Sequence, residues 1–464
     1  MTDPITLSAT AIAQAIRDGD LGAKEVLDAT LSRIDEENPQ LNAIVARMDD
    51  EARATAHAID SARLRGDDLP PLAGVPVTVK VNVDQMGQAT TNGLRLQSGL
   101  IGDEDNPVVA NLRRAGAVIV GRTNTPAFSL RWFTRNSLHG QTLNPYDALL
   151  TPGGSSGGAG AAVAAGMGAI AHGTDIAGSI RYPAYACGVH GLRPSLGRVP
   201  AFNATAGDRH IGGQLMAVSG PLARTIPDLR LAFTAMAAPD LRDPWFMPVP
   251  LVGPPAHRRV ALIEAPDGMA VATEVRTALH AAAAQLQAQG WEVDIPTPPP
   301  LREGLAVQIA LWMADMRRIE EAVLREDDPD ARFIYDQFCR ISPALSADGL
   351  MDALRVRSRL VRLWRQFFEE WPLVLCPVSG AVPFANNIDV RSPEDFDQVI
   401  EAQLPQIVPP LMGLPGLAVT TDLSGPTPMG VQFLAAPFRE DLLLAAGQAV
   451  ALEVPPIRAR ATIA

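Results

Sequence analysis

One segment constrains the fold more than any other: TPGGSSGGAGAAVAAG, residues 151–166. It passes without a break from a Gly/Ser run into an Ala-rich helical pattern. A flexible linker normally joins independent units, whereas this run leads straight into a helix. The pattern therefore predicts a tightly packed internal helix over residues 157–172 and not a domain boundary.

The paired serines of this segment admit more than one interpretation. Ser155 or Ser156 could cap the following helix with its hydroxyl, which needs no chemistry. The segment also matches G-x-S-x-G in two overlapping frames, but that nucleophile elbow requires a buried strand immediately before it, and TLNPYDALLTP contains prolines at both ends. A third pattern, Gly166-Met167-Gly168 with Ala171, resembles a dinucleotide fingerprint, but it lies within the predicted helix. A cap and a reaction centre both remain open at this point.

Strand and helix patterns alternate along the chain. Residues 1–65 predict helices, one capped by Ser8 and one from Ala23 to Glu36 that ENPQ ends. GVPVTVKVNV predicts a strand whose valines face one way while Lys80 faces polar groups on the other side. Residues 300–370 are mainly helical and rich in bulky side chains. Without a detectable repeat, this alternation predicts one large α/β domain over residues 1–464, with a mixed, twisted central sheet covered by helices on both faces.

Composition and charge exclude several classes of function. Apolar residues make up 47% of the chain but form no run long enough to cross a bilayer, so no membrane partner is expected. The N-terminus lacks a basic region followed by an apolar block, and Cys187, Cys339 and Cys376 are too dispersed for a disulfide framework or a zinc site, so a cytoplasmic location is expected. A net charge of −12 disfavours nucleic acid as a partner. No histidine or carboxylate spacing indicates a metal, and no cofactor is expected.

Several motifs occur together in one order. GVPVTVKVNVD precedes PGGSSGG, and GTDIAGSIRYPA follows it. Together they resemble the amidase signature family of serine hydrolases, which use a Ser-Ser-Lys triad. The likeness is continuous over residues 74–200, through GRTNTP, HGQTLNPYD and CGVHGLRPSLGRVP, and weaker at LPGLAV and PMGVQFLAAPFRED. The resemblance implies the fold of that family, with residues 74–200 as its signature core.

The resemblance implies Ser179 as nucleophile, Ser155 as bridging serine and Lys80 as base. An amide carbonyl is a poor electrophile, so its cleavage benefits from an activated hydroxyl and a covalent acyl-enzyme. A lysine acts as a base only when neutral, so its reference pKa of about 10.4 must fall on burial or beside other positive charge. The valines around Lys80 are consistent with that burial. In this family the bridging serine follows a cis peptide bond, expected here between Gly154 and Ser155.

The resemblance also implies supporting roles. In the tight loop DIAGS, backbone N–H groups can converge on the oxyanion of the tetrahedral intermediate. Ser129 falls at a substrate-contacting position, Gly154 permits close backbone approach, and Ser156 caps the helix or supports the triad. Asp175 and Arg181 are expected to form a structural ion pair. The expected oxyanion donors are Ile176, Ala177, Gly178 and Ser179.

The function expected from this resemblance is an amidohydrolase that cleaves small carboxamides, with aryl amides, esters and urethanes as open alternatives. Residues 300–370, with Met313 and Met316, are expected to form the substrate pocket. Two other functions stand as alternatives: a glutaminase subunit of an amidotransferase complex, and a catalytically idle binding protein on the same fold. A homodimer is the default expectation for a soluble enzyme. The identities of the acyl group and the amine are left open.

Overall fold

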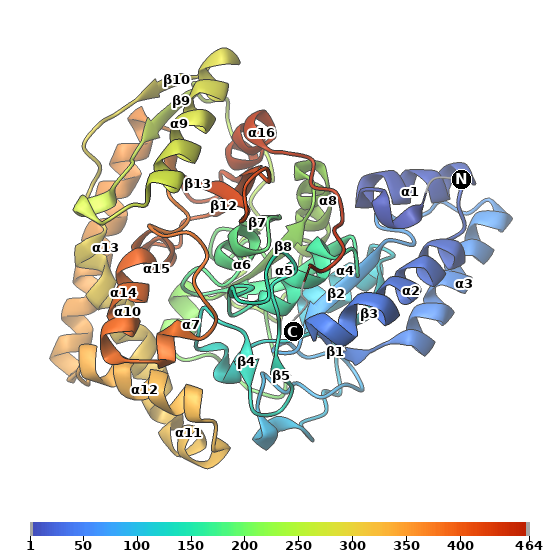
Figure 1. The fold of residues 1–464 in the computed structure, drawn as a ribbon, viewed down its shortest axis with the longest axis horizontal. Helices are drawn as coiled ribbons and strands as arrows, with labels where there is room; N and C mark the ends of the chain where they lie inside the picture. Colours follow the sequence, from blue (N-terminus) through green and yellow to red (C-terminus); the bar gives the residue numbers. More distant parts are fainter. Residues whose placement is uncertain (1–2, 461–464) are drawn as a thin grey trace.

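The computed structural model describes residues 3–460, which form one α/β domain around a large sheet (Figure 1). The sheet has 11 strands in the order β1-β3-β2-β6-β8-β7-β12-β13-β11-β9-β10. Its strands are β1 (Ile44–Arg47), β2 (Pro76–Lys80), β3 (Val118–Thr123), β6 (Ile170–Asp175), β7 (His190–Arg193), β8 (Val218–Ala223), β9 (Arg259–Leu262), β10 (Glu292–Asp294), β11 (Leu373–Cys376), β12 (Gly416–Asp422) and β13 (Met429–Ala435). A separate hairpin pairs β4 (Arg135–Asn136) with β5 (Gly140–Gln141).

The sheet is mixed, as the sequence predicts. Parallel pairing joins β2 to β3 and β6 on one side and β9 to β10 and β11 on the other. Between them, β6, β8, β7, β12, β13 and β11 pair antiparallel in succession. The parallel strands β2 and β6 end at the same edge of the sheet, which brings Lys80 and the segment after Asp175 together.

Helices flank both faces of the sheet. On β12, Gly416 faces the Arg181 side chain of α6, whereas the next residue, Leu417, faces Gly447 of α16. Successive strand residues point to opposite faces, so α6 and α16 cover opposite faces. The helices are α1 (Ala9–Asp18), α2 (Ala23–Leu41), α3 (Asp49–Arg65), α4 (Pro107–Arg114), α5 (Gly157–Ala164), α6 (Arg181–Ala186), α7 (Ile211–Met216), α8 (Ile226–Met236), α9 (Thr273–Ala288), α10 (Arg302–Met316), α11 (Glu320–Glu326), α12 (Pro329–Ile341), α13 (Ala347–Glu370), α14 (Pro393–Ala402), α15 (Leu404–Leu411) and α16 (Glu440–Val450).

The end predicted for the second helix is wrong. Helix α2 runs through ENPQ to Leu41, with Pro39 inside its last turns. The proline leaves the carbonyl of Asp35 without its helical donor, and Asp35 lies on the exposed face, where water can replace that donor. Ser8 caps α1 as predicted, because its hydroxyl accepts from the Ala11 N–H.

The internal helix of the Gly/Ser segment is also shorter than predicted. Helix α5 ends at Ala164, and strand β6 begins at Ile170. Gly166 adopts a φ of 73°, and a Cβ there would lie 2.8 Å from Ile5 and 3.0 Å from Pro456. The Gly166-Met167-Gly168 pattern therefore occupies a helix-to-strand turn, which is not the strand-to-helix turn that a dinucleotide site requires. Every residue of α5 is buried, as expected for a helix made of small residues.

In the described residues, no helix is both long enough and apolar enough to cross a membrane.

Candidate active site

Lys80 lies at the carboxyl end of β2, a strand whose five residues are all buried. Its side chain is fully buried, and its Nζ lies 2.7 Å from Ser155 Oγ, 3.1 Å from Ser156 Oγ and 3.1 Å from Thr174 Oγ1. Burial lowers the pKa of Lys80 well below its ordinary value, and the charge of Asp175 opposes this shift. Burial thus favours the neutral amine, which is the form that a base requires.

The three contacts of Lys80 match in number the three hydrogen-bonding positions of a neutral amine. A neutral amine has two hydrogens to donate and one lone pair to accept with. Thr174 Oγ1 already accepts from Asn82 Nδ2 at 2.9 Å, and Ser156 Oγ is within 3.3 Å of the Thr174 backbone. The relay requires the lone pair to face Ser155, the shortest of the three contacts, which leaves the two amine hydrogens for Ser156 and Thr174.

The segment that carries the serines approaches its neighbours closely. A Cβ at Gly154 would lie 2.5 Å from the Phe133 backbone nitrogen, so only glycine fits there. The Gly154–Ser155 peptide bond is cis, which confirms the sequence prediction. Ser156 stands at the N-cap position of α5 but makes no capping hydrogen bond. The capping interpretation of the paired serines is therefore wrong, because both hydroxyls contact Lys80 instead.

Ser179 follows β6 in the tight loop before α6, and its side chain lines the same cavity as Ser155. Among the described residues its Oγ has no hydrogen-bond partner, so the link from Ser155 to Ser179 is not closed in this structure. Catalytic hydrogen bonds are often long in the absence of substrate and tighten when it binds. The structure thus brings Lys80, Ser155 and Ser179 to one site and joins the first two directly.

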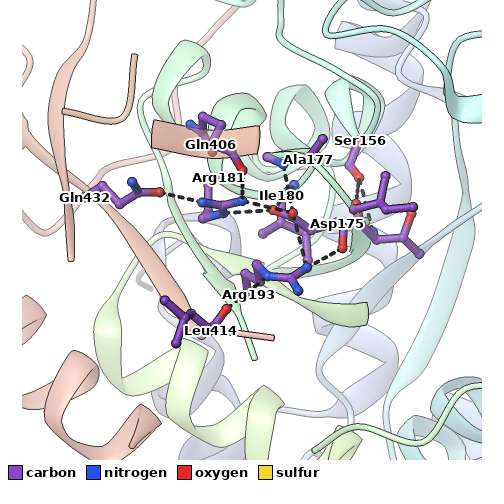
Figure 2. Close-up of polar contacts among 12 residues, drawn as sticks. Ser156, Asp175, Ala177, Ile180, Arg181, Arg193, Gln406, Leu414 and Gln432 are labelled. Atoms are coloured by element: carbon purple, nitrogen blue, oxygen red, sulfur yellow. Dashed lines mark hydrogen bonds and ion pairs between the residues drawn. The ribbon is translucent and has the colours of Figure 1, made fainter. Parts of the chain in front are cut away.

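The Asp175 carboxylate holds the loop around Ser179 in place. Figure 2 shows the Asp175 carboxylate between two buried guanidiniums, with Arg181 Nε at 3.0 Å and Arg193 Nη1 at 3.4 Å. Burial favours the neutral acid, but the two arginines outweigh it and hold the pKa of Asp175 at about 2. The predicted Asp175–Arg181 ion pair is therefore present. Arg181 also donates to Gln432 Oε1 and to the Gln406 carbonyl, which ties the loop to β13 and α15.

Gly178 was expected to be an oxyanion donor, but its N–H is not available for that role. Its N–H donates to Asp175 Oδ1 at 2.8 Å and so is already engaged. Gly178 has a φ of 102°, and a Cβ there would lie 2.6 Å from Gln406, so the residue is required for the loop's shape. In the described part of the chain, no hydrogen bond engages the N–H groups of Ile176, Ala177 and Ser179.

A cavity of about 650 Å³ opens over the serines. Ser129 lines it, with its Oγ bonded to Asn92 Oδ1 at 2.7 Å and a φ of 53°. The aromatic residues that line it are Phe128, Phe202, Trp245 and Trp312. The site is a cavity lined by both aromatic and polar side chains, with Ser155 and Ser179 among them.

The expected origin of the pocket is largely wrong. Of residues 300–370, only Trp312 lines the cavity; Met313 and Met316 are buried in the core. Much of the wall comes from residues 201–209, a segment without regular structure. This wall is tied to the chain just beyond Lys80: the buried Asp84 accepts from the Thr205 N–H at 2.9 Å and from Thr205 Oγ1 at 2.6 Å.

No cluster of three or more potential metal ligands occurs among the described residues. Sequence reasoning missed two polar residues at the site. Thr174 contacts Lys80 from β6, and Gln308 of α10 donates to the Ile176 carbonyl. Thr174 stands within GTDIAGS, where its place one residue before Asp175 was a usable signal; Gln308 carries none in the sequence.

Comparison with known proteins identifies the family of this chain. The family model described as Amidase matches residues 25–444. The chain belongs to the amidase family. This amidase is 41% identical over 448 residues to an indoleacetamide hydrolase of Bradyrhizobium diazoefficiens, covering 96% of this chain and 86% of that protein. It is 30% identical to a glutamyl-tRNA(Gln) amidotransferase subunit from a Cyanothece species, covering 91% and 92% of the two chains.

A solved structure of 6-aminohexanoate cyclic dimer hydrolase is similar to the amidase throughout, with a TM-score of 0.84, 25% identity and coverage of 99% of both chains. The predicted family, the mixed-sheet fold and the class of enzyme are confirmed. The protein is a hydrolase of carboxamide C–N bonds outside peptides, and the amidotransferase subunits are more distant relatives than the indoleacetamide hydrolase.

Proposed function

We propose that this amidase hydrolyses arylacetamides, with indole-3-acetamide as the representative substrate, to the aryl acetate and ammonia. The observation that carries the proposal is the buried Lys80–Ser155 pair beneath an aromatic-lined cavity of about 650 Å³. The similarity to indoleacetamide hydrolase supports the same substrate class. A flat aromatic acyl group suits a cavity lined by two tryptophans and two phenylalanines.

Acylation begins with attack of Ser179 Oγ on the amide carbonyl. As the C–O bond forms, Ser179 passes its proton to Ser155 Oγ, and Ser155 passes its own proton to the neutral Lys80 amine. The resulting ammonium returns a proton along the same path to the leaving nitrogen. The C–N bond then breaks, and ammonia departs from an acyl-enzyme on Ser179. A water molecule, activated by the same relay, hydrolyses the ester to release the carboxylate.

The tetrahedral intermediates carry a negative oxygen that needs fixed donors. We assign this role to the N–H groups of Ile176, Ala177 and Ser179, because the Gly178 N–H is engaged by Asp175. Asp175 and Arg181 act as structural support for this loop. Ser129 contacts substrate from the cavity wall, and Ser156 and Thr174 keep the lone pair of Lys80 directed at Ser155.

The test combines turnover with labelling. Wild-type protein is assayed on indole-3-acetamide, on its methyl ester analogue, on an aryl carbamate and on glutamine, and a fluorophosphonate adduct is located by peptide mass spectrometry. The proposal expects turnover of indole-3-acetamide, a label on Ser179, and loss of both in Ser179→Ala and Lys80→Met. Turnover of glutamine alone would favour the amidotransferase role. A label on Ser155 or Ser156 would overturn the assigned roles.

We further propose a homodimer in the cytoplasm. All three cysteines are free, and a reducing compartment keeps them so. Sedimentation equilibrium of the purified protein tests the dimer, and a monomer mass at micromolar concentration would contradict it. Fractionation of the producing cells tests the location.

A further inference from the structure

Each carbonyl of the nucleophile loop, residues 175–179, accepts a hydrogen bond from a different residue. The Asp175 carbonyl accepts from Arg193, and the Ser179 carbonyl accepts from the Ser156 N–H at 3.2 Å. The Gly178 carbonyl accepts from the Tyr182 N–H at 2.8 Å, in the first turn of α6. Two side chains hold the remaining carbonyls: Trp132 Nε1 bonds to Ala177 O at 2.8 Å, and Gln308 Nε2 bonds to Ile176 O at 3.1 Å.

Anchored carbonyls fix the directions of the N–H groups. In a trans peptide the C=O and the N–H of one unit point in opposite directions. Where Trp132 holds Ala177 O, the opposite N–H of Gly178 meets Asp175 Oδ1, and where Ser156 holds Ser179 O, the N–H of Ile180 meets Asp175 Oδ2. By the same rule, the bond from Gln308 to Ile176 O directs the Ala177 N–H away from α10 and leaves it free.

Gln308 is placed for this task by helix α10. Three residues share one face of the helix: Gln308 at the loop, Trp312 at the cavity and Asp315, whose carboxylate accepts from the N–H groups of Gly212 and Gly213 in α7 at 3.1 and 2.8 Å. The Gln308 side chain is fully buried, and its Oε1 has no partner in the described residues. Burying an unpaired oxygen is destabilising, so a purely structural core would favour an apolar residue at this position.

We infer that Gln308 is a positioning residue of the oxyanion hole, and that its side-chain amide orients the Ala177 N–H toward the tetrahedral intermediate. The inference rests on the proposed function, because it needs the anion to form at Ser179. Gln308 does not touch the substrate; it acts through the Ile176–Ala177 peptide. Its loss lets that peptide rotate and weakens binding of the transition state more than binding of the ground state.

The experiment compares Gln308→Met, which keeps the length and removes the donor, with Gln308→Glu and with a matched control, Val307→Ala, on the same helix. We expect Gln308→Met to lower kcat for indole-3-acetamide by about 10- to 100-fold while KM changes by less than about 3-fold. The inhibition constant of phenylboronic acid, whose Ser179 adduct places an oxygen in the hole, should rise by a similar factor. Val307→Ala should leave all three values unchanged.

Gln308→Glu adds a readout that a merely structural role would not move. A protonated carboxyl can donate to Ile176 O, whereas a carboxylate repels it, so the activity of this variant relative to wild type should increase as the pH falls. Thermal melting of each variant establishes that it is folded. Unchanged kcat in folded Gln308→Met, or equal weakening of substrate and boronic acid, overturns the inference.

Labelling distinguishes a failure of the proposed substrate from a failure of the positioning role of Gln308. If wild type does not turn over indole-3-acetamide, the proposed substrate fails, but the rate of fluorophosphonate labelling of Ser179 still reports on the hole, because the phosphonyl oxygen occupies it. Slower labelling of Gln308→Met than of Val307→Ala then supports the positioning role, and equal rates overturn it.

Discussion

Among single residues, Lys80 links the chemistry of the site to the stability of the fold. The fold places its amine at the end of a fully buried strand, where burial keeps the pKa well below its ordinary value. The relay needs a neutral amine, whereas Lys80 of the unfolded chain carries a proton at neutral pH. Function and stability are therefore opposed at this position.

Lys80→Met separates the two effects. It should lower kcat/KM by at least about 10³-fold, because no group remains to accept the proton of Ser155. It should also raise Tm near pH 7 by about 2 °C or more, because methionine is buried without losing a proton. The measurement is a melting curve for both proteins across pH 7 to 10.5.

The sign of the pH dependence makes this test specific. Between the depressed folded pKa of Lys80 and its ordinary value of 10.5, the unfolded wild type binds one more proton than the folded form. The free energy of unfolding of the wild type therefore rises with pH relative to that of Lys80→Met. The difference in Tm between the two proteins should shrink toward pH 10.5. A difference that stays constant across this range would contradict the neutral lysine.

Local patterns located several elements, although ENPQ does not end α2 and β2 is shorter than the segment GVPVTVKVNV; features fixed by distant contacts were not predicted. Strand β2 and the cap of α1 follow from local pattern. The boundary between α5 and β6 did not, because a run of alanine and glycine has no hydrophobic periodicity to show where it ends. The cavity wall at residues 201–209 has no pattern of its own and depends on Asp84, more than a hundred residues earlier.

Helix α10 shows the same limit. Its bulky residues predicted a pocket, yet only the face that carries Gln308 and Trp312 reaches the site. Which face of a helix meets a cavity depends on its packing partners, here α7, α13 and α15, and those are not readable from periodicity alone.

Trp312→Ala tests the role of this face in substrate choice. The variant removes a large apolar wall, so kcat/KM for indole-3-acetamide should fall by about 10- to 100-fold, whereas that for propionamide should change by less than about 3-fold. Steady-state kinetics with both amides is the measurement. An equal fall for both substrates would mean that Trp312 supports the loop and does not recognise the aryl group.

For the molecule as a whole, the mixed sheet and its two helical layers were predictable from alternating patterns, but the strand order was not. The order joins β7 to β12 across more than two hundred residues. His190 reinforces this long-range pairing from within the sheet: its Nδ1 accepts from the Thr420 N–H at 3.2 Å, and its Nε2 bonds to the Leu452 carbonyl at 2.9 Å. A protonated imidazole cannot accept from Thr420, so the pairing needs the neutral ring.

The stability of the whole chain should therefore depend on His190 at acid pH. Burial lowers the pKa of His190 to about 4, although the Leu452 carbonyl opposes the shift. Below pH 6.5 the imidazole of His190 binds a proton in the unfolded chain, whereas in the folded chain it does so only near pH 4. The free energy of unfolding therefore falls by up to about 1.4 kcal/mol per pH unit across this range as the pH decreases. His190→Gln removes the titrating group while its amide can both accept and donate. We expect its Tm to decline less than that of wild type between pH 7.5 and 5, whereas the exposed control His57→Gln should follow wild type. Parallel declines for all three proteins would show that His190 does not govern the acid response.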